Sequence, residues 1–447
     1  MTARLNRFSL LRLLLCIRRI DRGEIVAFQN VQLRRLIRHA YRNVPHYRRL
    51  FDHTGIKPED IRTVADLSAI PVTAKKDLAT LSPEEVVARG VDPRSLAIHK
   101  TSGSSGEPFT IRRTRSESAL LEAFRFRAMR YYGLRMTDRR AAINLLRPSP
   151  RRARWISLRT LRTLGNYRRT EIDCLRPPEE IIAILRDFHP DIVGGFAGAV
   201  SQVAQLMNDD DRRIIRPRFV VVGGEVLTPL MRQQVLAAFQ APVFNLYGSH
   251  EFNLIAWQCK ETGDFHTCDD GMIVEVLKGN RPASAGERGE VVGTSLHSFA
   301  MPFIRYRLGD IVTKGSETCA CGMPFSTIRA IQGRMVDYFP LPNGRVIHPY
   351  EIVLILMREG APWLRSYRLL QEREDRVLLY AVASVEPTRF QLDRLATAIT
   401  AVLGRDVEFQ VRLVPEIQLE ESGKFRISRS LVRSNYDGID WGPPSSG

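Results

Sequence analysis

The chain has 447 residues, more than one compact core usually holds, so we expect two domains. Hydrophobic residues make up 44% of it and charged residues 26%, a composition that excludes a largely disordered chain. The 66 Lys and Arg residues outnumber the 49 Asp and Glu residues, and the net charge of +17 indicates anionic partners without choosing among them. The chain has no helix-turn-helix pattern and no alternation of aromatic and basic residues, so nucleic acid is not an expected partner.

The N-terminus carries an apolar stretch, residues 8–17, between arginines. It is shorter than the roughly 20 apolar residues that a membrane span needs, and it has no small-residue cleavage site. We expect a helix packed on its own domain, and peripheral membrane contact is the alternative. The lack of an export signal, with Cys16 and Cys174 unpaired, predicts a cytoplasmic protein.

Apolar spacing predicts a helix over residues 33–41 that Pro45 ends. Short apolar runs that end in glycine or polar turns then predict buried strands at 141–146, 219–222, 243–247 and 290–294. This pattern is typical of an α/β domain whose ligands bind at strand ends.

The pattern changes near Gly333. Residues 376–382 and 407–411 read as strands and residues 392–403 as a helix between them, a β-α-β set of normal domain size. We therefore predict an α/β protein with a large N-terminal domain of mixed sheets, residues 1–335, and a small α+β C-terminal domain, residues 336–447.

Residues 101–108 (Thr-Ser-Gly-Ser-Ser-Gly-Glu-Pro) interleave glycines with hydroxyl side chains. Such a loop can surround an anion with backbone N–H groups and hydroxyls, although a plain mobile turn would look the same. It is not the phosphate loop of P-loop NTPases, because no Gly-Lys-Ser/Thr follows.

Three further motifs follow apolar segments. Gly223-Gly-Glu225 would let a flat ring approach the backbone, and a tight turn is the alternative. In 247–251 (Tyr-Gly-Ser-His-Glu), Tyr247 offers a stacking face and Glu251 a ligand for Mg²⁺. In the third, 305–310, the carboxylate of Asp310 follows a tight turn and is suited to binding two ribose hydroxyls.

Two more motifs lie near the domain junction and the C-terminus. These are 333–337 (Gly-Arg-Met-Val-Asp) and 422–426 (Ser-Gly-Lys-Phe-Arg), the second of which carries Lys424 on a glycine-led loop. By itself Lys424 would read as a solvated surface lysine.

The order and spacing of these six motifs resemble the acyl-adenylate-forming superfamily, and within it the phenylacetate–coenzyme A ligase branch with its CapK-like relatives from capsule biosynthesis. Residues 39–51 and 70–77 are also similar to that branch, so the resemblance covers nearly the whole chain. It implies an adenylate-forming large domain and a mobile small domain.

The resemblance also implies a role for each motif. The ATP phosphates would be bound by Thr101, Ser102, Gly103, Ser104, Ser105 and Gly106. The adenine pocket would be formed by Gly223, Gly224, Glu225, Tyr247, Gly248 and Ser249. Asp310 would bind the ribose and Glu251 the Mg²⁺. The remaining catalytic residues would be His250, Arg334 and Lys424, with Lys424 touching both the carboxylate and the α-phosphate.

The implied reaction joins a carboxylic acid to AMP, releases pyrophosphate and passes the acyl group to an acceptor, first of all coenzyme A. One alternative keeps the adenylation but uses an amine or hydroxyl acceptor, as in capsule biosynthesis. A second is an inactive, basic, zinc-containing protein that binds nucleic acid or membranes. A homodimer is compatible with the sequence.

Some positions depart from the superfamily pattern. Glu107 stands where many relatives have lysine, His250 and Leu308 where threonine is usual, and Val336 at a hinge position that often carries aspartate or lysine. A histidine at residue 250 titrates near neutrality, so these departures indicate a changed substrate or a pH dependence more than a loss of catalysis.

Four cysteine and histidine residues predict a structural zinc site. Cys259 and His266 flank an expected hairpin turn, and Cys319 and Cys321 lie in another turn. Free thiols are the alternative, and Cys268 is a competing ligand. Between residues 147 and 169 eight arginines occur without an acidic residue. They suit a phosphate group or an acidic glycan, form a solvated basic face, or contact a membrane surface.

Overall fold

The computed structural model describes residues 20–100, 109–146, 168–334, 338–347, 349–359, 363–420 and 424–432. The chain divides into two compact units. Unit 1 joins Met1–Gly133 to Leu246–Ile331, and unit 2 joins Leu134–Asn245 to Gln332–Gly447. The predicted domain boundary at residues 335 and 336 stays a prediction.

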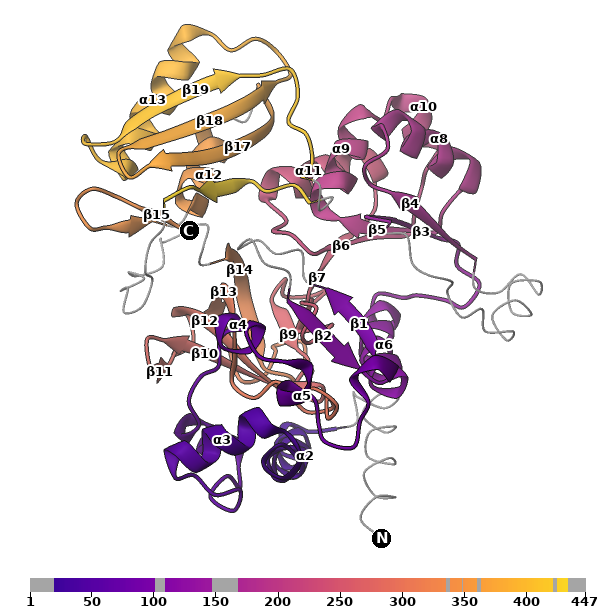
Figure 1. Cartoon of the computed structure of the whole chain (residues 1–447). Coiled ribbons are helices and arrows are strands. Elements are labelled where there is room, and N and C mark those ends of the chain that lie inside the picture. Colours follow the sequence, from indigo (N-terminus) through magenta and orange to yellow (C-terminus); the bar gives the residue numbers. More distant parts are fainter. Residues whose placement is uncertain are drawn as a thin grey trace. The chain divides into compact units, whose positions relative to one another are not determined.

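Unit 1 combines N-terminal helices with a mainly antiparallel sheet (Figure 1). Its helices are α2 (Arg22–Asn43), α3 (Pro45–Thr54), η2 (Val64–Ala69), α4 (Lys75–Ala79), α5 (Pro83–Val86), η3 (Pro93–Ser95) and α6 (Arg115–Tyr131). Its strands are β1 (Ala97–Lys100), β2 (Thr110–Arg113), β8 (Ala256–Gln258), β9 (Phe265–Thr267), β10 (Met272–Lys278), β11 (Arg281–Pro282), β12 (Arg288–Ser295) and β13 (Tyr306–Lys314), with the ends of β7 (Val243–Tyr247) and β14 (Thr327–Arg334). The strand order is β11-β10-β12-β13-β14-β9-β8-β7, and β1 pairs with β2 alone.

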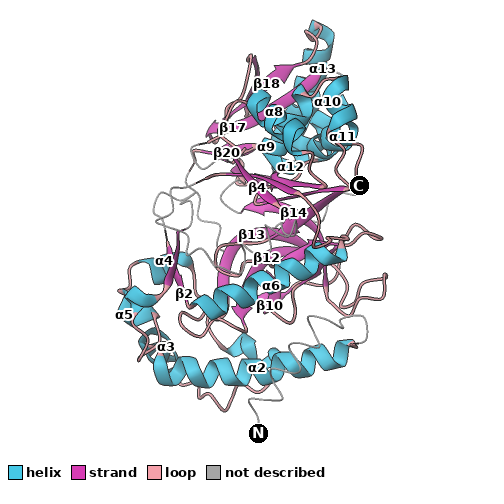
Figure 2. Ribbon diagram, turned by 90° about the vertical axis from the view of Figure 1, so that its right-hand side faces the viewer, coloured by secondary structure: helices cyan, strands magenta, loops and turns pink. Residues whose placement is uncertain are grey.

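Helix α2 is amphipathic, as the apolar spacing of residues 33–41 predicts, but it is longer than predicted and begins at Arg22 (Figure 2). Asp21 caps its first turn, and Pro45 begins the next helix, so the chain breaks where the sequence predicts. The buried face of α2, including Leu33 and Leu36, packs against Ile273 of β10 and Leu296. This packing attaches the N-terminal helices to the sheet of unit 1.

Unit 2 begins as a parallel α/β layer. Its strands β3 (Arg140–Asn144), β4 (Arg169–Asp173), β5 (Ile192–Phe196) and β6 (Phe219–Gly223) are ordered β6-β5-β3-β4. The helices of this layer are α8 (Pro178–Phe188), α9 (Ala197–Leu206), α10 (Asp209–Ile214) and α11 (Pro229–Phe239). Strand β6 is rich in valine and buried from Phe219 to Val222, as an inner strand of a parallel sheet covered by helices requires, whereas β4 is largely half-buried or exposed.

The C-terminal part of unit 2 is a four-stranded sheet, ordered β19-β18-β17-β20, with helix α13 against it (Figure 1). The elements are β15 (Phe339–Pro340), β16 (Val346–Ile347), α12 (Pro349–Glu359), β17 (Leu364–Arg373), β18 (Arg376–Ala383), α13 (Arg389–Leu403), β19 (Glu408–Leu413) and β20 (Ser428–Ser430). Val382, Ile417 and Phe425 of this part join the hydrophobic core of the α/β layer.

The α/β class with mixed sheets and a C-terminal β-α-β set is confirmed. The strands predicted at 141–146, 219–222, 243–247, 290–294, 376–382 and 407–411 are β3, β6, β7, β12, β18 and β19, with ends shifted by two residues at most. Within the part of the chain that the structure describes, no helix is long and apolar enough to cross a membrane. The N-terminal stretch 8–17 lies outside the described residues.

Candidate functional site

Tyr247 and Asp310, assigned by the sequence to adenine and ribose, lie together in unit 1. Tyr247 ends β7 and donates a hydrogen bond of 2.6 Å from its hydroxyl to Oδ2 of Asp310 in β13. Gly309 precedes Asp310 with a φ of 77°, a conformation that favours glycine. An aromatic face and an oriented carboxylate are therefore adjacent, 63 residues apart in the chain.

The loop after β7 holds the proposed Mg²⁺ ligand. Glu251 is buried, and Oε1 of its carboxylate accepts a 3.2 Å hydrogen bond from the hydroxyl of Tyr306. Gly248 is required by the close approach of this loop to itself, because a Cβ there would lie 2.0 Å from the carbonyl oxygen of Asn253. The side chain of Ser249 accepts a hydrogen bond from the backbone N–H of Phe252, and His250 is exposed at the surface of the loop.

Arg113, which sequence reasoning missed, fixes the backbone of this loop. Its buried guanidinium donates to the carbonyl oxygens of both His250 and Glu251. Burial, with the nearby charge of Arg113, lowers the pKa of His99 across the hairpin. Arg113 lies on β2, five residues after Pro108, and no local pattern marks it.

The candidate phosphate loop, Thr101 to Gly106, joins β1 to β2 but lies outside the described residues, as does Glu107. The two strands form an antiparallel hairpin in which Lys100 pairs with Thr110. Arg113 therefore lies on the same β1–β2 hairpin whose two strands this segment connects.

In unit 2, Gly223-Gly-Glu225 follows β6. Gly224 has a φ of 78° and lies against the ring of Phe196, where a Cβ would approach ring carbons to 3.0 Å. The half-buried carboxylate of Glu225 accepts hydrogen bonds from the backbone N–H of Gly198, at 2.6 Å, and from that of Phe425. Burial raises the pKa of Glu225 to about 7, although both N–H donors and Lys424 act to lower it.

Lys424 is half-buried, and its Nζ lies 6.0 Å from the centre of the Phe196 ring, within reach of a cation–π contact. Arg334 ends β14, and its side chain lies outside what the structure describes, as do Val336 and Asp337. Of the arginine-rich segment, residues 147–167 lie outside the described residues, and Arg169 forms an ion pair with Glu171.

The four predicted zinc ligands come together in unit 1. The ligand atoms of Cys259, His266, Cys319 and Cys321 all lie within 4.8 Å of one another. The predicted hairpin is present, because β8 and β9 pair antiparallel and Cys259 N–H donates to Asp264 across the turn. We call these four residues the Cys–His cluster.

The chemistry of the Cys–His cluster suits a metal ion. Burial opposes ionisation of Cys259, but hydrogen bonds from Thr262, Tyr131 and the Glu261 N–H outweigh it and lower its pKa to about 7. Burial lowers the pKa of His266 to about 4, which keeps the ring neutral. Thiolates and a neutral imidazole are the donors that zinc prefers.

Cys268, the competing ligand, points elsewhere. Its Sγ is fully buried and contacts Arg127 at 3.8 Å and Asp270 at 3.6 Å. Arg127 and Asp270 form a buried ion pair, so this cysteine belongs to the core behind helix α6.

The sequence of the chain is similar to those of curated proteins, among them coenzyme A ligases. No protein-family model matches the chain. A phenylacetate–coenzyme A ligase of Thermus thermophilus is 26% identical over 381 residues, which are 79% of this chain and 80% of that protein. Protein CapK of Staphylococcus aureus is 21% identical over 257 residues, 56% of this chain and 55% of its own length.

The fold is also similar to that of solved coenzyme A ligases. The crystal structure of a 2-hydroxyisobutyryl-CoA ligase in its postadenylation state matches with a TM-score of 0.73 at 21% identity, over 89% of this chain and 88% of that one. These relatives support the acyl-adenylate-forming superfamily that the sequence motifs predict. This adenylate-forming ligase is therefore an enzyme of the AMP-forming class, and the resemblance to the phenylacetate–coenzyme A ligase and CapK-like branch is confirmed.

Proposed function

We propose that this adenylate-forming ligase activates a carboxylic acid with ATP and transfers the acyl group to coenzyme A. The observation that carries the proposal is the hydrogen-bonded pair of Tyr247 and Asp310 beside the loop of Glu251. An aromatic face, a ribose-binding carboxylate and a metal-binding carboxylate are the groups that an ATP molecule needs. The ligases of similar sequence use coenzyme A by name, which supports the choice of acceptor.

In the first step a carboxylate oxygen of the acid attacks the α-phosphorus of ATP. A P–O bond forms to the acid, and the bond to the β-phosphate oxygen breaks so that pyrophosphate leaves with its electron pair. Both reactants are anions, so cationic groups at the developing charge lower the barrier most. Lys424 would supply that charge, and His250 and Arg334 would contact phosphate oxygens.

Glu251 would hold Mg²⁺, which when bound screens the phosphate charges. Its buried carboxylate fits this role, because Tyr306 contacts one oxygen only through a hydroxyl and Arg113 binds the backbone instead of the side chain. The hydroxyl and glycine residues 101–106 would surround the phosphates.

In the second step the coenzyme A thiolate attacks the acyl carbonyl carbon and AMP leaves, which yields the thioester. The C-terminal residues 336–447 would deliver Lys424 for the first step and withdraw for the second, as a small mobile domain. The domain boundary at 335 and 336 is part of this proposal.

A structural zinc ion in the Cys–His cluster completes the proposed cofactors. The donor set fits, since three sulfur atoms and the ring of buried His266 converge, and Nδ1 of that ring has no hydrogen-bond partner in the described residues. When bound, the metal would join the β8–β9 hairpin to the turn at 319–321 and take no part in the reaction.

The test is exchange of labelled pyrophosphate into ATP across a panel of aryl, fatty and amino acids. We expect exchange with one class of acid, and a loss of about 100-fold or more in Lys424→Ala, because a charge at the reacting phosphate is removed. Lys57→Ala, an exposed lysine of unit 1, is the matched control and should keep wild-type exchange.

Product analysis then identifies the acceptor. A coenzyme A thioester supports the proposal, whereas exchange without thioester formation would assign an amine or hydroxyl acceptor. Failure of the wild type to catalyse exchange with any acid, combined with salt-dependent retention on DNA or lipid vesicles, would overturn the enzymatic function.

A further inference from the structure

Helix α9 begins without a side-chain cap of its own. Its N-cap residue, Phe196, makes no capping hydrogen bond, so the first backbone N–H groups need another acceptor. Oε2 of Glu225 accepts the N–H of Gly198, the second residue of the helix, at 2.6 Å. A carboxylate at a helix N-terminus is favoured by both the N–H donor and the helix dipole.

The other oxygen of the same carboxylate accepts the N–H of Phe425, the residue after Lys424. Glu225 therefore joins helix α9 of the α/β layer to the segment that carries Lys424. A second contact supports the link, in which the amide of Gln202 on α9 donates to the carbonyl oxygen of Ile417 at 3.3 Å.

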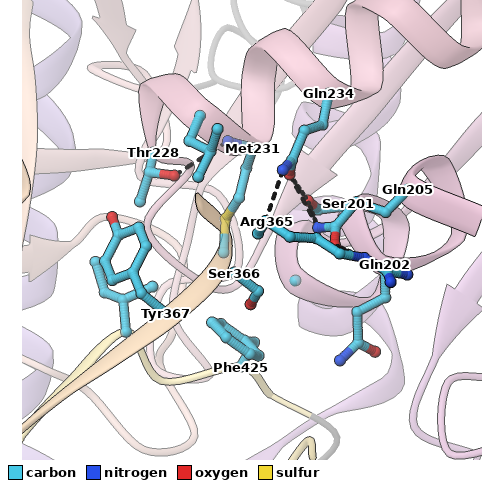
Figure 3. A pocket seen from close by; sticks show the side chains of 13 residues that line it. Ser201, Gln202, Gln205, Thr228, Met231, Gln234, Arg365, Ser366, Tyr367 and Phe425 are labelled. Carbon is cyan, nitrogen blue, oxygen red and sulfur yellow. Dashed lines mark hydrogen bonds between the residues drawn. The ribbon is translucent and has the colours of Figure 1, made fainter. Parts of the chain in front are cut away.

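The segment also fits α9 by shape. A Cβ on Gly198 would lie 2.1 Å from the Cβ of Phe425, so only glycine allows this approach. The ring of Phe425 is buried and lines a small cavity with Ser201, Gln234 and Arg365 (Figure 3). Side-chain hydrogen bonds close the wall of the cavity, from Ser201 to Gln234 and from Gln234 to the carbonyl oxygen of Arg365.

On its other side the segment is held by β17. Arg368 donates to the carbonyl oxygens of Arg426 at 3.0 Å and Gln418 at 2.9 Å, and its guanidinium lies over the ring of Phe425. These contacts stay within the C-terminal part of unit 2. The contacts made by Glu225 and Gly198 with Phe425 instead reach the α/β layer, so they depend on where the segment docks.

We propose that Glu225 is a positioning residue for adenylation, whose carboxylate holds the Lys424 segment against the N-terminus of helix α9 while the acid is activated. This inference rests on the proposed function, in which Lys424 serves the first step. Release of Phe425 from Glu225 would then free the segment to withdraw before the acyl group is transferred.

The first experiment measures the contact itself, through hydrogen–deuterium exchange of the peptide containing residues 424–432. Glu225→Gln offers one oxygen and one NH₂ group to two N–H donors, so one bond is lost and exchange should rise roughly tenfold. Gly198→Ala introduces a better helix former, but its Cβ obstructs Phe425, so it should raise exchange to a similar extent. Glu179→Gln removes an exposed carboxylate of α8 in the same unit and should leave exchange unchanged.

The second experiment separates the two half-reactions, using the acid that wild type accepts. In Gly198→Ala, pyrophosphate exchange should fall roughly tenfold in kcat, while thioester formation from supplied acyl-adenylate stays within about twofold. Glu225→Gln should lower the kcat of exchange with little change in the KM for ATP.

These experiments distinguish failure of the positioning role of Glu225 from failure of the proposed function. A raised KM for ATP with unchanged amide exchange in Glu225→Gln would assign Glu225 to the adenine pocket only and overturn the positioning role. An equal loss in both half-reactions of Gly198→Ala would overturn it as well. If the variants loosen the segment but wild type exchanges pyrophosphate with no acid, the proposed function fails and the adenylation role fails with it.

Discussion

At the residue scale, a hydrogen bond from Tyr247 helps to orient Asp310, the residue proposed to bind the ribose. Asp310 lies on a strand whose backbone is turned by Gly309, and its carboxylate is held by the hydroxyl of Tyr247. The ring of Tyr247 provides the stacking face and its hydroxyl orients the carboxylate. The two roles can be separated, because phenylalanine keeps the ring and removes only the hydroxyl.

Tyr247→Phe should raise the KM for ATP about tenfold and leave kcat nearly unchanged. Loss of a hydrogen bond to a charged group costs about 1.5 kcal/mol, which is close to a factor of ten in binding. Initial rates of pyrophosphate exchange at varied ATP concentration measure this effect.

The matched control is Tyr41→Phe, since Tyr41 also donates to a carboxylate, that of Asp52, but on the exposed surface of unit 1. It should leave both constants as in the wild type. An unchanged KM for ATP in Tyr247→Phe would show that Asp310 is oriented without it.

At the element scale, helix α9 and the Lys424 segment are coupled to pH through Glu225. Burial raises its pKa to about 7, so an opening that exposes the carboxylate to water returns the pKa to the ordinary range of glutamate. The contribution of Glu225 to the stability of the closed state is therefore full at low pH and is lost as the pH rises through about 7, because burial outweighs the opposite effects of the Phe425 N–H and Lys424. Two charged groups act on the carboxylate electrostatically: Lys424, which favours its ionised form, and Glu420, which opposes it.

The protection factor of the Phe425 amide, corrected for the intrinsic pH dependence of exchange, should be several-fold higher at pH 6 than at pH 8. Glu225→Gln should abolish this difference, because glutamine does not titrate. Cys174 also interacts electrostatically with Glu225, but burial raises its pKa to about 11. It therefore does not titrate between pH 6 and pH 8. Protection that increases with pH would contradict the assigned sign.

At the scale of the whole molecule, each compact unit is assembled from segments that are distant in the chain. In unit 1 the Cys–His cluster joins the β8–β9 hairpin to a turn more than fifty residues later, at Cys319 and Cys321. A metal at this point would cross-link the unit, as a disulfide does elsewhere, and its removal should be felt in global stability.

Purified protein should contain one zinc ion per chain by elemental analysis, and Cys319→Ser should contain none. Loss of the metal should lower the free energy of unfolding by roughly 2 kcal/mol or more, or about 4 to 8 °C in Tm for a unit of this size. Cys174→Ser, a buried cysteine outside the Cys–His cluster, should keep its zinc. A Cys319→Ser variant with wild-type metal content would refute the site.

Local sequence determined the elements and the motifs. Apolar spacing is a property of neighbouring residues, so helix α2, the buried strands β3, β6 and β7 and the C-terminal β-α-β set could all be predicted. The four members of the Cys–His cluster could be predicted as well. The chemistry of cysteine and histidine restricts their roles, and the sequence predicts a turn beside each pair of ligands.

Only the tertiary structure decided which distant groups meet. Arg113 and Gly198 are an ordinary arginine and glycine in sequence. Their roles depend on groups 138 and 227 residues away, the carbonyl oxygen of Glu251 and the side chain of Phe425. Likewise the carboxylate of Glu225 could be placed near a nucleotide from its motif, but its bond to Phe425 arises from the packing of two layers. A hydrogen bond or a close approach between remote segments leaves no periodic trace along the chain, since it is specified by the whole fold.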